Sequence, residues 1–226
     1  MAQGEELSPR KRPRQRRSRA TVDAIVAAAA RVFSEQGYAG GSTNRIAETA
    51  GVAIGSLYEY FPNKAAILVA VAERQVDRMM ADIDQLLADA QTEGPSLERW
   101  IRRFVAAMLE VHERDPRLHH AVFAEAPHPP ELHACVLQME ERLAHRVESL
   151  LRETPGVSLP DPDTAAHLVV QTTEALTHRF AHEGIHDLPR ERFLDEVVAL
   201  LLGYLLGSRR SCLLGGVPAD PAAHTG

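Results

Sequence analysis

Cysteine is scarce in this chain of 226 residues, which contains only two, Cys135 and Cys212. Two cysteines cannot build a disulfide framework, and the sequence has no Cys-x-x-Cys pair of the kind that binds metal or performs redox chemistry. Aromatic residues make up only 5% of the chain, so Ala, Leu and Val must fill most of the core. The composition therefore predicts a protein of a reducing, cytoplasmic setting rather than a disulfide-stabilised secreted one.

Long hydrophobic runs are also missing. The longest apolar stretch, 197–207, is about half of the roughly 20 residues that a membrane-spanning helix needs. A basic N-terminus precedes the alanine-rich run 24–30, but Asp23 and Arg31 bracket that run and no cleavage-like context follows it. We therefore expect neither a secretory signal nor a membrane partner.

Charge is distributed unevenly along the sequence. The net charge is −6, yet residues 1–64 sum to +4 and residues 65–226 to −10. A basic segment on an acidic body favours a polyanionic partner at one end, although a solvated tail would have the same composition. The basic residues of the first twenty are Arg10, Lys11, Arg12, Arg14, Arg16, Arg17 and Arg19.

Hydrophobic residues recur with a period of 3.6 through nearly the whole chain, and no alternating strand pattern is present. We expect an all-α fold of nine helices without a sheet. Glycine, proline and capping residues set the expected ends of these helices. The expected helices cover 21–36, 43–50, 54–60, 64–90, 97–115, 117–125, 131–153, 162–184 and 189–210.

Two of these helices are short and joined by the Gly-containing turn 51–53, which is the layout of a helix-turn-helix. Leu57 and Phe61 lie four residues apart and are expected to point into a small core with Ile46. The outer face of the second helix then carries Tyr58, Tyr60 and a glycine. Tyrosine hydroxyls can donate to phosphates and glycine allows close approach of a backbone, so this face indicates DNA binding. Unrelated helical proteins also contain such corners.

The segment TNRIAETAGVAIGSLYEYFPNK at 43–64 resembles the DNA-binding signature of the TetR/AcrR family of transcriptional regulators. The preceding AAARVF at 28–33 and the pair Gly37-Tyr38 match the family too. The resemblance covers about residues 17–68, and only the helical architecture is similar beyond it. It implies a homodimeric prokaryotic repressor that leaves a pseudo-palindromic, double-stranded DNA operator when a small molecule binds.

The resemblance also implies a domain organisation. Residues 1–20 would form a basic disordered arm and 21–64 a three-helix DNA-binding head. Residues 65–210 would form an effector-binding and dimerisation domain, followed by a disordered tail at 211–226.

Family roles carry over to particular positions of the head. Arg45 is the best candidate for a guanine contact, because its planar fork suits O6 and N7. The recognition helix itself has no Arg, Lys, Asn or Gln, so base reading would also rest on contact of Ile54 with thymine methyls and on DNA shape. The arm could follow the DNA backbone or enter the minor groove. The expected DNA-binding residues are Thr43, Arg45, Ala53, Ile54, Gly55, Ser56, Tyr58, Tyr60 and Lys64, with Arg14, Arg16 and Arg17 from the arm.

The remainder of the chain carries the candidate residues of a ligand pocket and of a dimer interface. Aromatic and Met residues at helical spacing could line an apolar pocket for a lipophilic effector, although most such stripes are core. The expected pocket residues are Trp100, Phe104, Met108, Phe123, Met139, Leu143, His167, Gln171 and His178. The final helix is apolar beyond one stripe, which favours a second copy packed against it. The expected interface residues are Leu168, Thr172, Leu176, Phe180, Val197, Leu201, Tyr204 and Leu205.

Eleven histidines raise the question of a metal. His178, His182 and His186 recur every four residues, and such pairs on a helix can ligate zinc. No Cys or carboxylate set completes a site, so surface or interface histidines are the favoured interpretation, and we expect no metal and no cofactor. The sequence shows no phosphate loop, nucleophile elbow or paired acids, so we expect no enzyme activity. A constitutive DNA-binding regulator and a metal-responsive regulator remain as alternatives.

Overall fold

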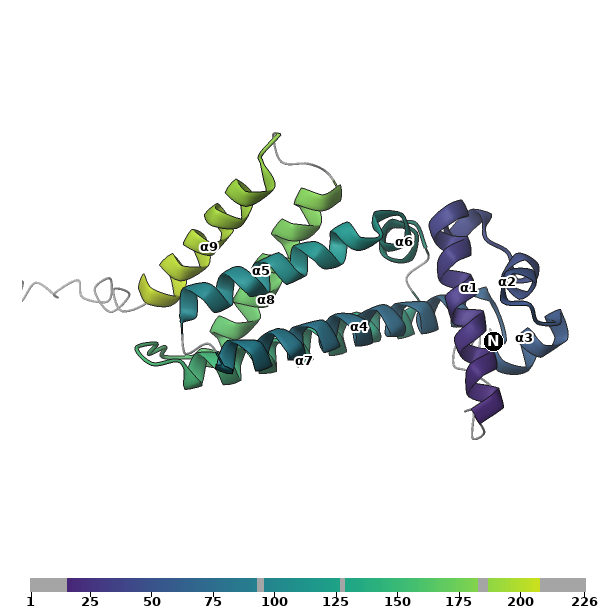
Figure 1. Cartoon of the computed structure of the whole chain (residues 1–226), viewed down its shortest axis with the longest axis horizontal. Coiled ribbons are helices and arrows are strands. Elements are labelled where there is room, and N and C mark those ends of the chain that lie inside the picture. The colour runs from purple at the N-terminus through teal and green to yellow at the C-terminus, as the bar shows by residue number, and fades with distance from the viewer. Residues whose placement is uncertain (1–15, 93–95, 127–128, 183–186, 208–226) are drawn as a thin grey trace, which may run out of the picture.

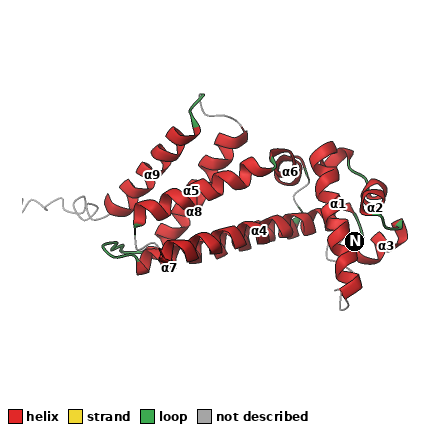
Figure 2. Cartoon of the chain, in the orientation of Figure 1, coloured by secondary structure: helices red, strands yellow, loops and turns green. Residues whose placement is uncertain are grey.

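The computed structural model describes residues 16–92, 96–126, 129–182 and 187–207, which form nine α-helices, one π-helical turn and no strand (Figures 1 and 2). The expectation of an all-α fold is confirmed. None of the helices in these ranges is long and apolar enough to cross a membrane. The elements are α1 Arg16–Gly40, α2 Thr43–Ala50, α3 Ile54–Tyr60, α4 Lys64–Thr92, α5 Leu97–Arg114, α6 Pro116–His120, η1 Ala121–Glu125, α7 Pro130–Glu153, α8 Pro162–His182 and α9 Arg190–Gly207.

Helices α1, α2 and α3 lie together at one end of the molecule, which we call the head (Figure 1). Local signals explain their bounds. The Ser42 hydroxyl accepts a hydrogen bond from the Arg45 N–H and caps α2. Gly51, in the left-handed region at φ 69°, ends that helix. Leu57 and Phe61 are fully buried with Ile46, as the spacing predicted.

The body of the molecule consists of the remaining helices. The long helix α4 leaves the head and runs along the body beside α7 and α5, while α8 packs against α7 and α5, and α9 packs against α5 (Figure 1). Trp100, Phe104 and Leu143 belong to the large core that these helices share.

The core of the head is completed by residues from the body. Leu118 in α6, Val122 in η1 and Leu132 in α7 are buried in the same hydrophobic cluster as Phe33, Ile46 and other head residues. The head and the body therefore pack against each other through apolar contacts and form one structural unit.

Several helix bounds differ from those expected. Helix α1 begins at Arg16 rather than Thr21, because the Arg, Ser and Ala residues taken for an arm also tolerate helix well. The expected helix 117–125 is a short α6 continued by the π-helical turn η1. Residues 1–15 of the expected arm, including Arg14, lie outside the described residues. So do His186 and the end of the expected last helix together with the tail.

Candidate nucleic-acid interface and ligand cavity

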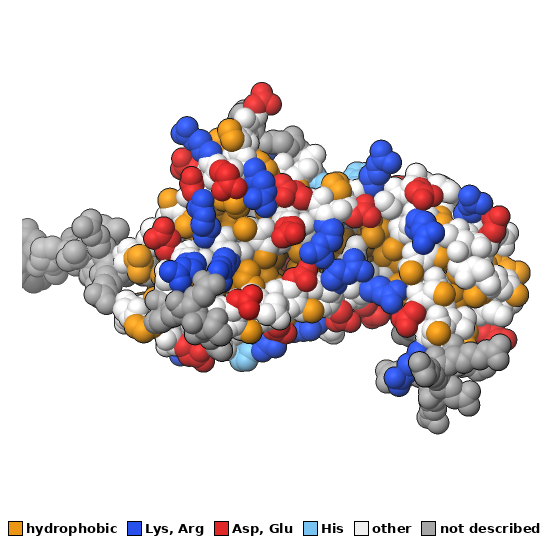
Figure 3. All heavy atoms as spheres, in the orientation of Figure 1, with side chains coloured by type: hydrophobic (Ala, Val, Ile, Leu, Met, Phe, Trp, Pro, Cys, Tyr) orange, Lys and Arg blue, Asp and Glu red, His pale blue; other side chains and the backbone are white. Residues whose placement is uncertain are grey.

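The outer surface of α2 and α3 carries the residues expected to meet DNA. Ile54 and Tyr58 are exposed at 39% and 41%, which is high for large apolar or aromatic side chains. Gly55 is exposed, and a Cβ added there would meet no atom within 4 Å. The Thr43 and Tyr58 hydroxyls lie 3.0 Å apart, so they join the start of α2 to α3. Figure 3 shows mostly uncharged side chains at this end of the molecule.

Arg45 projects from α2 into solvent but is paired with a neighbour one turn later. Its Nη1 donates to Glu48 Oε2 at 2.8 Å, and half of its side chain is exposed. An exposed pair of this kind is weak, so a guanine could displace Glu48 at small cost. The predicted contact to a base is thus compatible with the structure and stays a prediction.

Lys64 holds the end of α1 and the loop that follows it. Its Nζ donates to the carbonyl oxygens of Tyr38 and Gly41 at 2.7 and 2.9 Å, and it lies over the Tyr38 ring. Burial lowers the pKa of this ammonium, against the opposing charge of Glu125. The structure gives Lys64 an internal role, and its phosphate contact stays a prediction.

The other expected DNA-binding residues lie around the same surface. Ala53 is the exposed N-cap of α3, Ser56 is half-buried, and Tyr60 packs partly against the head core. Arg16 and Arg17 are the first residues of α1.

A cavity of about 730 Å³ lies between the head and the body. Its walls come from α1, α4, α5, α6, η1, α7 and α8. The apolar lining includes Val26 of α1, Met79 of α4 and Val136 of α7. Four arginines outnumber three carboxylates among its lining residues, which are Arg31, Arg74, Arg78 and Arg114 against Glu35, Asp115 and Glu174.

The structure brings only three of the nine expected pocket residues to this cavity, namely Phe123, Met139 and His178. Trp100, Phe104, Met108 and Leu143 are instead buried in the body core. Gln171 is exposed on α8, and His167 faces Glu141 and Asp163 at the surface. The four buried positions were assigned from helical spacing, which indicates a buried face without telling a cavity wall from a core, whereas His167 and Gln171 were assigned as polar contacts.

The sequence did not predict that α1 forms part of the cavity wall, or that His112 and Glu174 line the cavity. His112 is 2% exposed and lines the cavity, where its Nε2 lies 3.1 Å from Glu174 Oε2. A signal was present, because His112 continues the i, i+4 spacing of Phe104 and Met108 along the buried face of α5.

Polar contacts hold the head to the body beside the cavity. The Ser34 hydroxyl donates to Asp115 Oδ1 at 2.9 Å. The Glu125 carboxylate accepts from the Ala39 and Tyr38 N–H groups at 2.8 and 3.1 Å. These backbone hydrogen bonds, led by that from Ala39, hold the pKa of Glu125 below its usual range. The end of α1 is thereby fastened to η1.

The expected dimer residues divide between core and surface. Val197, Leu201 and Leu205 are buried against the chain's own core, and Leu176 and Phe180 pack partly against it. Thr172 is half-buried. Leu168 of α8 and Tyr204 of α9 are exposed, and so are two leucines of α9 outside the expected set, Leu200 and Leu206.

The head surface and the helical body together define a class of protein, the helix-turn-helix transcriptional regulators. Residues 25–71 match the family described as bacterial regulatory proteins, tetR family, and residues 96–205 match the tetracyclin repressor-like C-terminal domain. The chain belongs to the TetR family and is a DNA-binding transcriptional regulator.

Curated relatives support this membership. The chain is 31% identical over 170 residues to the nucleoid occlusion factor SlmA of Vibrio vulnificus, a match that covers 71% of this chain and 82% of SlmA. It is 35% identical over 118 residues to the HTH-type transcriptional repressor KstR of Mycolicibacterium smegmatis, covering 50% and 53% of the two chains.

Solved structures share the fold. The fatty acid degradation regulator FadR of Bacillus halodurans aligns with a TM-score of 0.65 at 22% identity, covering 86% of this chain and 98% of that one. FadR of Bacillus subtilis, solved in complex with stearoyl-CoA, aligns with a TM-score of 0.61 at 20% identity, covering 79% and 96%.

Proposed function

We propose that this regulator is a homodimeric repressor that leaves its operator when a small molecule with an apolar chain and an anionic group enters the cavity. The observation that carries the proposal is the position of the cavity, whose walls include α1 of the head and α4, the helix that leaves the head. A ligand there touches the DNA-binding end of the molecule directly.

The lining of the cavity supports this ligand chemistry. Its volume falls within the range of small-molecule sites, which are mostly apolar with a few polar groups. Exposed arginines at its edge, Arg31 and Arg78, would attract a carboxylate or phosphate. The apolar residues would hold a hydrocarbon chain, and the FadR structure with stearoyl-CoA shares this fold.

The proposed switch depends on the separation of two heads. A dimer that reads two half-sites needs its heads about 34 Å apart, or a multiple of that distance. A ligand between α1, α4 and α5 favours one spacing of these helices, and it weakens DNA binding only by its preference between the two states. The second copy is supported by the exposed leucines of α8 and α9.

Fluorescence anisotropy tests the proposal. Binding of the full chain to the DNA upstream of its own gene is compared with binding to scrambled DNA across a salt series, with a preference of about 10³ or more expected. Stearoyl-CoA, stearate and free coenzyme A are then added separately. We expect the two compounds with an acyl chain to release the DNA and coenzyme A to leave it bound.

A pair of variants links release to the cavity. Val136→Trp fills the cavity, whereas Leu137→Trp changes the next residue, which is exposed on α7. The first should bind DNA and resist release, and the second should behave as the parent. Specific binding that no acyl compound reverses would instead favour a regulator without this class of effector.

A further inference from the structure

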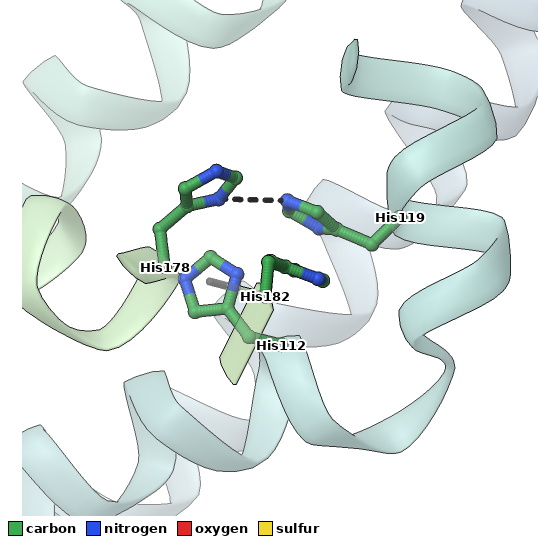
Figure 4. A group of neighbouring side chains, drawn as sticks. All are labelled: His112, His119, His178 and His182. Carbon is green, nitrogen blue, oxygen red and sulfur yellow. Dashed lines mark hydrogen bonds between the residues drawn. The ribbon is translucent and has the colours of Figure 1, made fainter. Parts of the chain in front are cut away.

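Four histidines from three helices meet beside the cavity, and three of them, His112, His119 and His178, line it. His112 comes from α5, His119 from α6, and His178 and His182 from α8, and their rings point toward one another (Figure 4). One ring nitrogen from each lies within 4.8 Å of those of the other three. His119 Nε2 and His178 Nδ1 are 3.3 Å apart. Tetrahedral zinc with Zn–N bonds of 2.0–2.1 Å needs about 3.3 Å between neighbouring donors, so small ring movements would complete such a geometry.

Two of the four rings hold a buried nitrogen that has no hydrogen-bond partner among the described residues, His112 Nδ1 and His182 Nε2. Buried polar atoms are almost always paired, because leaving one unpaired costs about 1–3 kcal/mol. Two unpaired nitrogens in one cluster therefore indicate a missing partner. A metal ion accepts lone pairs from both.

Glu174 orients the most buried ring of the cluster. A carboxylate accepts hydrogen bonds, so His112 donates its Nε2–H to Glu174 Oε2 at 3.1 Å. The Nδ1 lone pair of His112 is then free to bind a metal. A carboxylate behind a histidine ligand is a usual feature of zinc sites, where it fixes the tautomer and adds basicity.

The environment favours the protonation state that a metal requires. Burial, together with the neighbouring histidines, lowers the pKa of His119 to about 3. Burial and the same neighbours lower the pKa of His182. Neutral imidazoles are the form that ligates metals.

We propose that His112, His119, His178 and His182 bind one divalent first-row transition metal ion, with Zn²⁺ as the best-fitting ion. Four imidazoles without a thiolate suit zinc, copper, cobalt or nickel, and exclude a site built for magnesium or calcium, which take oxygen ligands. The bound ion would tie α6 to α5 and α8 at the wall of the cavity. The proposal differs from the sequence-based interpretation of His178 and His182 as surface or interface histidines.

Metal binding is measured on the untagged full chain after chelator treatment, without DNA or effector, so its outcome is independent of the proposed function. Calorimetric titration with Zn²⁺ should give one ion per chain. Co²⁺ should produce the strong visible absorption of a tetrahedral site. X-ray absorption of the zinc-loaded parent should show a nitrogen shell near 2.0 Å with at least three imidazoles, and this readout needs no variant.

Variants locate the site. His119→Gln and His178→Gln, on different helices, should each weaken Zn²⁺ binding by at least tenfold, and Glu174→Gln by about 10–100-fold. The matched controls are His120→Gln, next to His119 and exposed, and His167→Gln on α8. Both should bind as the parent does, and the helix content of every metal-free variant is checked by circular dichroism. Absent stoichiometric binding, fewer than three imidazoles, or affinity unchanged in both His119→Gln and His178→Gln would overturn the proposal.

Discussion

We expect base recognition by single residues to depend most on Arg45, because α3 has the sequence IGSLYEY and carries no basic or amide side chain. Arg45→Ala should weaken binding to the operator by about 1–3 kcal/mol and relax specificity at one base pair, since a bidentate guanine contact has that value. Anisotropy on the operator and on single-base variants measures both effects. Glu48→Gln, which removes the ion pair of Arg45, is the matched control and should bind at least as tightly.

A loss of affinity that is equal for every DNA sequence would contradict this role. It would show instead that Arg45 contacts a phosphate.

Gly37 is a second position where a single residue matters. Its φ of 72° and ψ of 172° lie in a region that other residues rarely adopt, and a Cβ there would lie 2.6 Å from Glu125 Oε2. Gly37→Ala should therefore lower the free energy of unfolding by about 1–3 kcal/mol in a denaturant titration. Gly156 also has a positive φ but would meet no atom within 4 Å. Gly156→Ala should lower the free energy of unfolding by less. Equal decreases in the two variants would mean that the Glu125 contact has no effect.

At the scale of secondary-structure elements, the junction of α1 with η1 makes stability depend on pH. The Ala39 and Tyr38 N–H groups lower the pKa of Glu125 from its usual 4.5, with His120 and Lys64 adding to this effect. A carboxyl whose pKa is lower in the folded than in the unfolded state stabilises the fold above its unfolded pKa. That stabilisation is lost as the pH falls through the folded value.

Thermal unfolding of Glu125→Gln tests this dependence. We expect its midpoint to lie below that of the parent at pH 7, with the difference shrinking below about pH 4. Glu110→Gln, an exposed carboxyl on α5, is the control and should show no such closing difference. A difference that is constant with pH would assign the effect to geometry and not to charge.

The secondary-structure elements could be predicted from the sequence better than the cavity between them. The bounds of α2 follow from Ser42 and Gly51, which act within one turn of the backbone, and both α2 and α3 lie where their sequences place them. The cavity depends on which faces of seven elements meet, and no local signal carries that information. Phe104 and Phe123 look alike in a periodic pattern, yet the first is core and the second lines the cavity.

The histidine cluster shows most clearly what the sequence alone could not predict. His178 and His182 were recognisable as a pair from their spacing. Their partners His112 and His119 lie about 60–70 residues earlier, and only the packing of α5 against α8, with α6 following α5, brings the four rings together.

For the whole molecule, the exposed apolar side chains of α8 and α9 predict the mode of assembly. Leu200 is 55% exposed in the middle of α9, and replacing it with Glu should place a charge in the proposed interface between two copies. Leu200→Glu should convert the dimer to a monomer in sedimentation velocity and weaken operator binding. Leu137→Glu, at an equally exposed leucine of α7, should leave the dimer intact. A parent chain that sediments as a monomer would refute the proposed dimer.

The shared core of the head has a consequence for synthesis on the ribosome. Phe61 is made early, but the Leu118, Val122 and Leu132 side chains that complete its cluster come up to about 70 residues later. At a synthesis rate of about 5–20 residues per second, these residues are added roughly 4–14 s after Phe61. During that interval the apolar surface of the head is exposed to chaperones. A chain whose synthesis stops before α6 cannot complete the core of the head. The core of the head is therefore complete only after the residues of α6, η1 and α7 that also line the cavity have been synthesised.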